Sequence, residues 1–132
     1  MTKPTAIFES DRLARFDIVI VPFPFTDKAA AKRRPALVLS SAQGFNRIAG
    51  HSVMAMITSA DNAPWVLDTP IADLKSAGLP APSVVRMKLF TLDHRFVLRR
   101  AGRLASNDAR AVDAALATLI FPHNRRGPGR AP

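Results

Sequence analysis

Cysteine is absent from the 132 residues of this chain, which excludes disulfide bonds, thiolate catalysis and cysteine-based zinc sites. Long apolar runs are also absent, since no segment approaches the ~18 consecutive apolar residues that span a membrane. The first residues, MTKPTAIFESDRLARF, lack the apolar core of a secretory signal peptide. We therefore expect a cytoplasmic protein.

Familiar catalytic and metal-binding motifs are missing as well. His51, His94 and His123 are scattered without the ligand spacing of a motif such as HExxH, so we expect no metal site. There is no GxSxG turn of a serine hydrolase and no GxxxxGKS/T loop of an NTPase. No cofactor is implied, and arginines and hydroxyl side chains are left as the candidate reactive groups.

Acidic residues are scarce relative to basic ones. The chain has 10 Asp and Glu against 19 Lys and Arg, which gives a net charge of +9. Such an excess favours binding to nucleic acid, or to an acidic protein partner, through a salt-sensitive electrostatic attraction. An acidic membrane surface is disfavoured as a partner, because the sequence has no basic amphipathic helix with a bulky apolar face.

Short strand-like runs dominate what is present. A length of 132 residues, 48% of them apolar, suits one domain with a modest core, and there is no repeat or long internal linker. The predicted strands are Asp17–Phe23, Ala36–Ser40, Ser52–Thr58, a weaker Trp65–Ile71, Ser83–Met87 and Arg95–Arg100. Because Pro and Gly separate these runs at irregular intervals, they predict a small antiparallel barrel or a strongly bent sheet.

The last third of the chain changes to a helical period. Its apolar residues recur at helical spacing, at Ala109, Val112, Leu116, Leu119 and Ile120. Ser106, Asn107 and Asp108 are candidates for the cap at its start. This pattern predicts a helix over about 107–121 that packs its apolar stripe on the sheet.

Residues 17–41 are the most informative part of the sequence. Two apolar runs flank a polar loop that ends in Lys32-Arg33-Arg34-Pro35, so the loop delivers three cations to one strand end. Pro35 biases Arg34 toward an extended backbone that projects its guanidinium. A guanidinium fixed at a sheet edge can hold a phosphate through paired donors. The alternative is a solvated hairpin loop on a basic protein.

The chain resembles the MazF/PemK family of toxins in four segments that occur in the expected order. DIVIVPFPFT at 17–26, followed by RRPALVLS at 33–40, is similar to the opening of the family. MAMITS at 54–59 resembles its third strand, which closes in Thr-Ser, and SVVRMKLFTLD at 83–93 resembles its later strand pair. The family usually has Gly where this chain has Phe16, a position that shapes the start of the strand and leaves the catalytic positions untouched.

The resemblance covers residues 16–121. It implies a β-rich α+β fold, a small SH3-like bent antiparallel barrel of the CcdB/MazF type with a C-terminal helix, paired as a homodimer. Residues 1–15 are then an N-terminal extension. Residues 122–132 are a basic tail that we expect to be disordered, since it carries arginines and no apolar anchor.

The resemblance also implies a function. Family members are toxins of type II toxin–antitoxin pairs that cut single-stranded RNA without a metal, and each is restrained by an antitoxin with a segment that covers the RNA groove. The positive charge of this chain predicts that the segment of its own antitoxin is acidic. The family's catalytic Arg and Thr fall here on Arg34 and Thr58. RNA carries its own nucleophile, so Arg34 would neutralise charge on the phosphorane while Thr58 holds the phosphate or leaving oxygen. Thr58 is otherwise a common β-former at a strand end.

Other residues are candidates for RNA contact, each beside a plainer interpretation. Lys32 and Arg33 would steer phosphates, or are only solvated charge. Ser59 would contact RNA or simply start the next turn. Arg86 and Lys88 alternate with apolar residues, which predicts one cationic strand face.

Three other functions stay open on the sequence. A non-catalytic toxin of the CcdB group would bind DNA gyrase, although that group lacks the Arg-Pro and Thr-Ser pair in this context. A plain RNA-binding barrel would use the basic patches without cleavage. An inactivated member of the toxin family would keep the same residues. The endoribonuclease is the favoured hypothesis.

Overall fold

The computed structural model describes residues 12–23 and 32–122. Within these ranges one antiparallel sheet has the strand order β4-β5-β3-β2-β1-β6. The strands are β1 (Asp17–Phe23), β2 (Lys32–Val38), β3 (His51–Ser59), β4 (Thr69–Pro70), β5 (Ser83–Asp93) and β6 (Arg99–Arg103). The helices are α1 (Arg47–Ala49), α2 (Leu74–Ala77) and α3 (Ser106–Ile120), with further helical turns at Ala42–Asn46 and His94–Phe96. The predicted β-rich α+β barrel with a C-terminal helix is confirmed.

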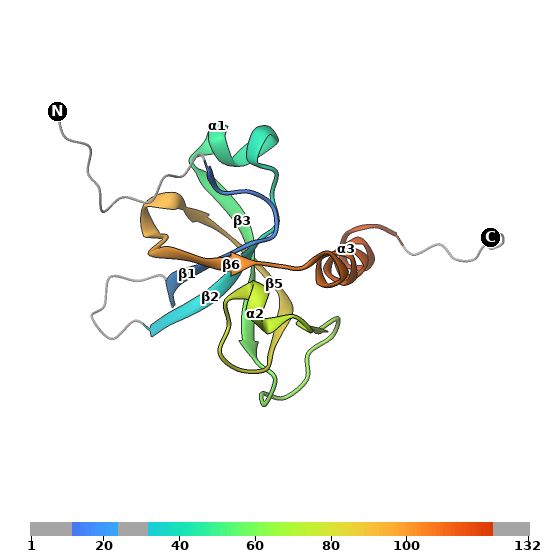
Figure 1. The fold of residues 1–132 in the computed structure, drawn as a ribbon. Helices are drawn as coiled ribbons and strands as arrows, with labels where there is room; N and C mark the ends of the chain where they lie inside the picture. The colour runs from blue at the N-terminus through green and yellow to red at the C-terminus, as the bar shows by residue number, and fades with distance from the viewer. Residues whose placement is uncertain (1–11, 24–31, 123–132) are drawn as a thin grey trace.

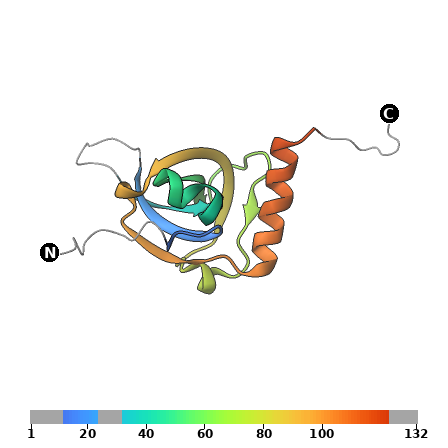
Figure 2. The same ribbon diagram turned by 90° about the horizontal axis from the view of Figure 1, so that it is seen from above.

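The sheet curls into an open barrel, with β4 and β6 at its two edges, because its longest strand, β5, is bent. Its register with β3 shifts between Ala55 and Met56, whose partners are Leu89 and Arg86, so Met87 and Lys88 are inserted at that point. An insertion of this kind bends a strand and increases its twist. Figure 2 shows the resulting ring of strands, with α3 alongside it. Figure 1 shows α1 at one end of the barrel and α2 at the other.

Apolar side chains are buried on both faces of the sheet. In β1, Ile18 contributes to one cluster, whereas Val19 and Val21 contribute to the other. In β2, Leu37 lies in the first cluster and Val38 in the second. This alternation follows from the strand period of two, and burial of both faces explains why these strands read as continuous apolar runs.

Helix α3 covers the first of these clusters. Val112 is fully buried there, and Asp113 forms an ion pair of 2.6 Å with Arg15. The expected side-chain cap is wrong, because Ala105 precedes the helix and makes no such bond. Asp108 instead accepts hydrogen bonds from the backbone N–H groups of Ala72 and Asp73, so it fixes the segment before α2.

The end of α3 also differs from the prediction. Val112 is buried, but Leu119 and Ile120 in the last turn are exposed, so the apolar stripe packs only along its first part. None of the helices in the described ranges is long and apolar enough to cross a membrane.

Several strand boundaries differ from the predicted ones. β2 begins at Lys32 instead of residue 36, because it pairs with β1 from Phe23 onward. The weak strand predicted over 65–71 is reduced to Thr69–Pro70. The last strand runs over Arg99–Arg103, after a 3₁₀ turn at His94–Phe96. Cross-strand pairing sets these limits, and pairing depends on residues far apart in the sequence.

The start of the domain carries an unusual backbone conformation. Phe16 has φ +75°, in the left-handed region that favours glycine, which is the residue that the resemblance noted above leads us to expect at this position. Arg15 lies 4.5 Å above the Phe16 ring, and Leu13 is fully buried among the second cluster. The tail from residue 123 and residues 1–11 of the predicted extension lie outside the described ranges.

Candidate functional site

Arg34 and Thr58 lie near the ends of two neighbouring strands, at the same end of the barrel. β2 pairs with β3 through Ala36 and Met56, and Arg34 and Thr58 each lie two residues beyond that pair. On its other side Arg34 pairs with Val21 of β1. The antiparallel register therefore brings together two residues that are well separated in the sequence.

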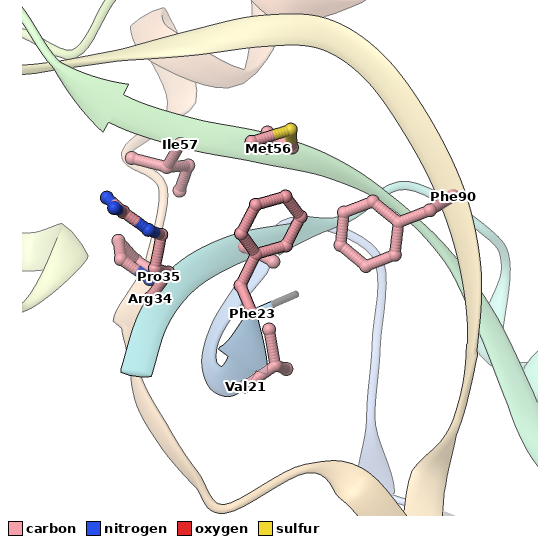
Figure 3. Close-up of a pocket in the computed structure, with 8 residues that line it drawn as sticks. Val21, Phe23, Arg34, Pro35, Met56, Ile57 and Phe90 are labelled. Carbon is pink, nitrogen blue, oxygen red and sulfur yellow. The ribbon is translucent and has the colours of Figure 1, made fainter. Parts of the chain in front are cut away.

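The side chain of Arg34 extends along an apolar hollow at this end of the barrel (Figure 3). The residues that line the hollow are Val21, Phe23, Arg34, Pro35, Ala36, Met56, Ile57 and Phe90. The guanidinium lies beside Ile57, and within the described ranges it has no hydrogen-bond or ion-pair partner. A guanidinium that has no partner among the described residues and lies against apolar walls is well suited to hold an anion, because charge interactions strengthen as water is excluded.

The hydroxyl of Thr58 is held by a residue from the loop that follows. Oγ1 accepts a hydrogen bond of 2.6 Å from Nδ2 of Asn62, and Thr58 is half-buried. The hydrogen of the hydroxyl is left to be donated elsewhere. Ser59 is exposed, and its Oγ accepts from the backbone N–H of Asp61, so it closes the turn.

The three consecutive cations of β2 do not share one face. Lys32 and Arg33 are exposed, whereas Arg34 is half-buried. Arg33 lines a second hollow, on the other face, together with Arg99 and Leu98. This separation follows from the alternation of side chains along a strand. Arg34 therefore enters the apolar hollow alone.

The two basic residues of β5 face the loop over residues 60–68. Arg86 donates from Nε and Nη2 to the carboxylate of Asp68, at 3.0 and 2.8 Å, and from Nη2 to the carbonyl of Ala63. These bonds lower the pKa of Asp68, with the side-chain hydrogen bond from Arg86 as the largest cause. The ammonium of Lys88 lies 4.2 Å from the ring of Trp65. The guanidinium of Arg86 thus binds residues of the loop, while Lys88 remains exposed.

The two histidines in the described part of the chain, His51 and His94, are not arranged as metal ligands. His94 is buried and its Nε2 lies 2.7 Å from Oγ of Ser52, while His51 lies 3.9 Å from the carboxylate of Asp93. Across residues 12–23 and 32–122, no group of three or more His, Asp or Glu side chains is placed to hold a metal ion. His123 lies outside these ranges.

Three residues of the loop over residues 60–68 were missed by the sequence analysis as parts of the site. Asn62 contacts Thr58, Asp68 holds Arg86, and Trp65 lies under Lys88. The Asp61-Asn62 pair is typical of a turn, but nothing local in the sequence predicts which hydroxyl the amide contacts.

The sequence matches, over residues 14–120, the family of PemK-like, MazF-like toxins of type II toxin–antitoxin systems. The chain belongs to this family. A search of curated protein sequences found no match.

Solved structures place this PemK/MazF-family toxin on the same fold. A MazE–MazF complex from Deinococcus radiodurans superposes with a TM-score of 0.65 at 22% identity, covering 82% of this chain and 95% of the other. The Mycobacterium tuberculosis toxin MazF-mt6 gives 0.60 at 23% identity, over 77% and 93%. An endoribonuclease in complex with its cognate antitoxin, from a mycobacterial species, gives 0.63 at 16% identity, over 84% and 96%. The expected MazF-type barrel is confirmed.

Proposed function

We propose that this toxin is a metal-independent endoribonuclease that cleaves single-stranded RNA in the cytoplasm. The observation that carries the proposal is the position of Arg34. Arg34 is half-buried, its guanidinium is free of partners in the described ranges, and it lies at the strand end next to the one that carries Thr58. A phosphodiester laid across these two strand ends would meet both side chains.

The chemistry follows from what RNA supplies. The 2′-hydroxyl attacks the adjacent phosphorus and loses its proton, the bond to the 5′-oxygen breaks and that oxygen gains a proton, so the products are a 2′,3′-cyclic phosphate and a 5′-hydroxyl. Arg34 would bind the non-bridging oxygens, whose negative charge grows in the transition state. Thr58, whose oxygen already accepts from Asn62, would donate its hydrogen to the phosphate or the leaving oxygen. Positioning and charge neutralisation would supply most of the acceleration.

The other cations would bring RNA to this point. Lys32 and Arg33 are exposed on the same strand end, and Lys88 is exposed on β5, so each is placed to attract phosphates. Ser59 would contact RNA at the start of the turn. For Arg86 we propose an indirect role, because its guanidinium already holds Asp68 and Ala63, and it would shape the loop that RNA meets.

An acidic antitoxin is the proposed protein partner, and a homodimer the proposed assembly. The net charge of +9 favours an acidic segment, and two of the similar structures contain a toxin with its antitoxin. Sedimentation at micromolar concentration would test the dimer, and a monomer there would count against it.

Cleavage of a long single-stranded RNA in EDTA tests the activity directly. Arg34→Ala and Thr58→Ala are compared with Arg110→Ala, which removes one positive charge from the exposed surface of α3. We expect discrete cuts with the wild type and Arg110→Ala, and losses of about 100-fold or more for Arg34→Ala. Bound but intact RNA would instead favour the non-cleaving barrel. Intact RNA with inhibited gyrase would favour a toxin of the CcdB type.

A further inference from the structure

The loop over residues 60–68 presents the only tryptophan of the chain to solvent. Trp65 is 48% exposed, and Val66 beside it is 76% exposed. A tryptophan normally buries most of its large apolar surface, so an exposed one on an ordered loop indicates a contact still to be made.

This loop is held in a defined conformation. The backbone N–H of Trp65 donates to Asp68 Oδ2 at 2.9 Å, and the N–H of Asp68 donates back to the carbonyl of Trp65 at 3.1 Å. Arg86 binds both oxygens of the same carboxylate and also the carbonyl of Ala63. Leu67 has φ +67°, a strained conformation that persists only where the surrounding contacts enforce it. These hydrogen bonds therefore fix the position of the backbone that carries the indole ring.

The same loop is joined to the candidate active site by hydrogen bonds. At one end of the loop, Asn62 donates to the hydroxyl of Thr58. At the other end, Asp68 is held by Arg86, whose cross-strand partner is Met56, two residues before Thr58. A strand of RNA whose phosphate reaches Thr58 would run past this loop.

The Trp65 ring and the ammonium of Lys88 together favour a nucleotide as the ligand. Lys88 places its ammonium over the Trp65 ring, 4.2 Å from its centre, so a cation lies against one face of an aromatic side chain that is 48% exposed. An aromatic face binds an unpaired base by stacking, and an adjacent cation binds its phosphate. The net charge of +9 makes a polyanion the favoured occupant.

We propose that Trp65 is a stacking platform for one unpaired base of the RNA, next to the scissile phosphate, and that Lys88 contacts the phosphate of that nucleotide. This inference rests on the proposed endoribonuclease function. It assigns a base-binding subsite to the loop between β3 and β4. It also explains a preference for single strands, because a paired base has no free face to offer.

The composition of the chain makes the test direct. With one tryptophan and no tyrosine, the intrinsic indole fluorescence of the protein reports on Trp65 alone. The probe is a single-stranded RNA with 2′-O-methyl groups, which removes the nucleophile so that the RNA stays intact. Double-stranded RNA and inorganic polyphosphate serve as ligands that carry the charge without a free base. We expect strong quenching by the single strand and little change with the other two.

Binding measurements on variants complete the test. Trp65→Ala should weaken binding of the single strand roughly tenfold, whereas Trp65→Phe should recover most of the affinity. The matched control is Phe96→Ala, which removes an aromatic side chain of similar exposure, 51%. Phe96 follows the end of β5, where β5 pairs with the start of β3, whereas the loop over residues 60–68 follows the end of β3. With unmodified RNA, which the protein can cleave, Trp65→Ala should raise KM and leave kcat nearly unchanged.

The outcomes separate this inference from the proposed activity. RNA that binds and is cut without quenching, with Trp65→Ala equal to wild type, would overturn the stacking site and leave the nuclease intact. Fluorescence that changes only on dilution of the protein would place Trp65 in a subunit interface, which also overturns the proposal. Quenching by a single strand that is never cut would support the stacking site and refute the nuclease.

Discussion

Asn62 donates a hydrogen bond of 2.6 Å from its side-chain amide to the hydroxyl oxygen of Thr58, which lies four positions earlier in the chain. The geometry fixes a direction, since an amide N–H can only donate and the hydroxyl oxygen must accept. The hydrogen of Thr58 then points to another acceptor. In the proposed mechanism that acceptor is an oxygen of the scissile phosphate.

Replacement of Asn62 therefore tests whether orientation of this hydroxyl matters. Asn62→Ala should lower the single-turnover rate of RNA cleavage by roughly threefold to tenfold, because one hydrogen bond contributes about 0.5–1.5 kcal/mol. The affinity for uncleavable RNA should change little, since the Lys and Arg side chains that attract the RNA phosphates remain. A fall in affinity with an unchanged cleavage rate would contradict the positioning role.

A second asparagine provides the control for Asn62→Ala. Asn107 lies at the exposed start of α3, where its side chain accepts from Arg110. Asn107→Ala removes the same group far along the chain from the candidate site, and it should leave cleavage unchanged.

Two glycines with similar backbone angles differ in what surrounds them. Gly50 has φ +67° with open space around an added Cβ, whereas Gly78 has φ +73° and a Cβ there would lie 2.0 Å from the carbonyl oxygen of Ala101. Gly50→Ala should lower the free energy of unfolding by about 1 kcal/mol, through the left-handed conformation alone. Gly78→Ala should cost a further 1–3 kcal/mol or so, because α2 and β6 must move apart. Urea denaturation at one protein concentration measures both, and equal losses would show that the close approach is unimportant.

Much of this fold could be predicted because its signals are local. The apolar runs of β1 and β3 and the helical period of α3 each occupy a few consecutive residues, and all three elements occur at the predicted places. Arg34 and Thr58 stood out through their immediate neighbours in the sequence. The position of Phe16 was noticed as a departure from Gly, and its φ of +75° gives the physical meaning of that departure.

The remaining features depend on contacts between distant residues. No local pattern predicts that the guanidinium of Arg86 binds Asp68, 18 positions earlier, instead of projecting into solvent as Lys88 does. Trp65 was predicted to begin a strand, because aromatic and β-branched residues favour strands. The hydrogen bonds of Asp68 hold it in a turn instead.

Burial of His94 predicts a pH dependence of stability. Burial is the largest cause of its lowered pKa, His51 adds to the effect, and the charge of Asp93 opposes it. In the unfolded chain the pKa returns to about 6.5, so below that pH the unfolded state binds more protons than the folded state. Stability should therefore fall as the pH drops from about 7 toward 5. His94→Gln should lose part of this dependence in urea titrations, and an unchanged slope would show that other groups cause it.

Neighbouring arginines on opposite faces of β2 separate electrostatic attraction from catalysis. Arg33 is exposed and Arg34 lines the apolar hollow, so the two variants remove the same charge one residue apart. Arg33→Ala should weaken RNA binding and reduce the slope of log affinity against log salt by at most about 0.7, the value for one phosphate contact on a single strand. Its cleavage rate at saturating RNA should stay near wild type. Arg34→Ala should instead lose about 100-fold in that rate, because its charge acts on the transition state. Equal losses of rate in both variants would mean that net charge at this strand end, and not the placement of one guanidinium, supports cleavage.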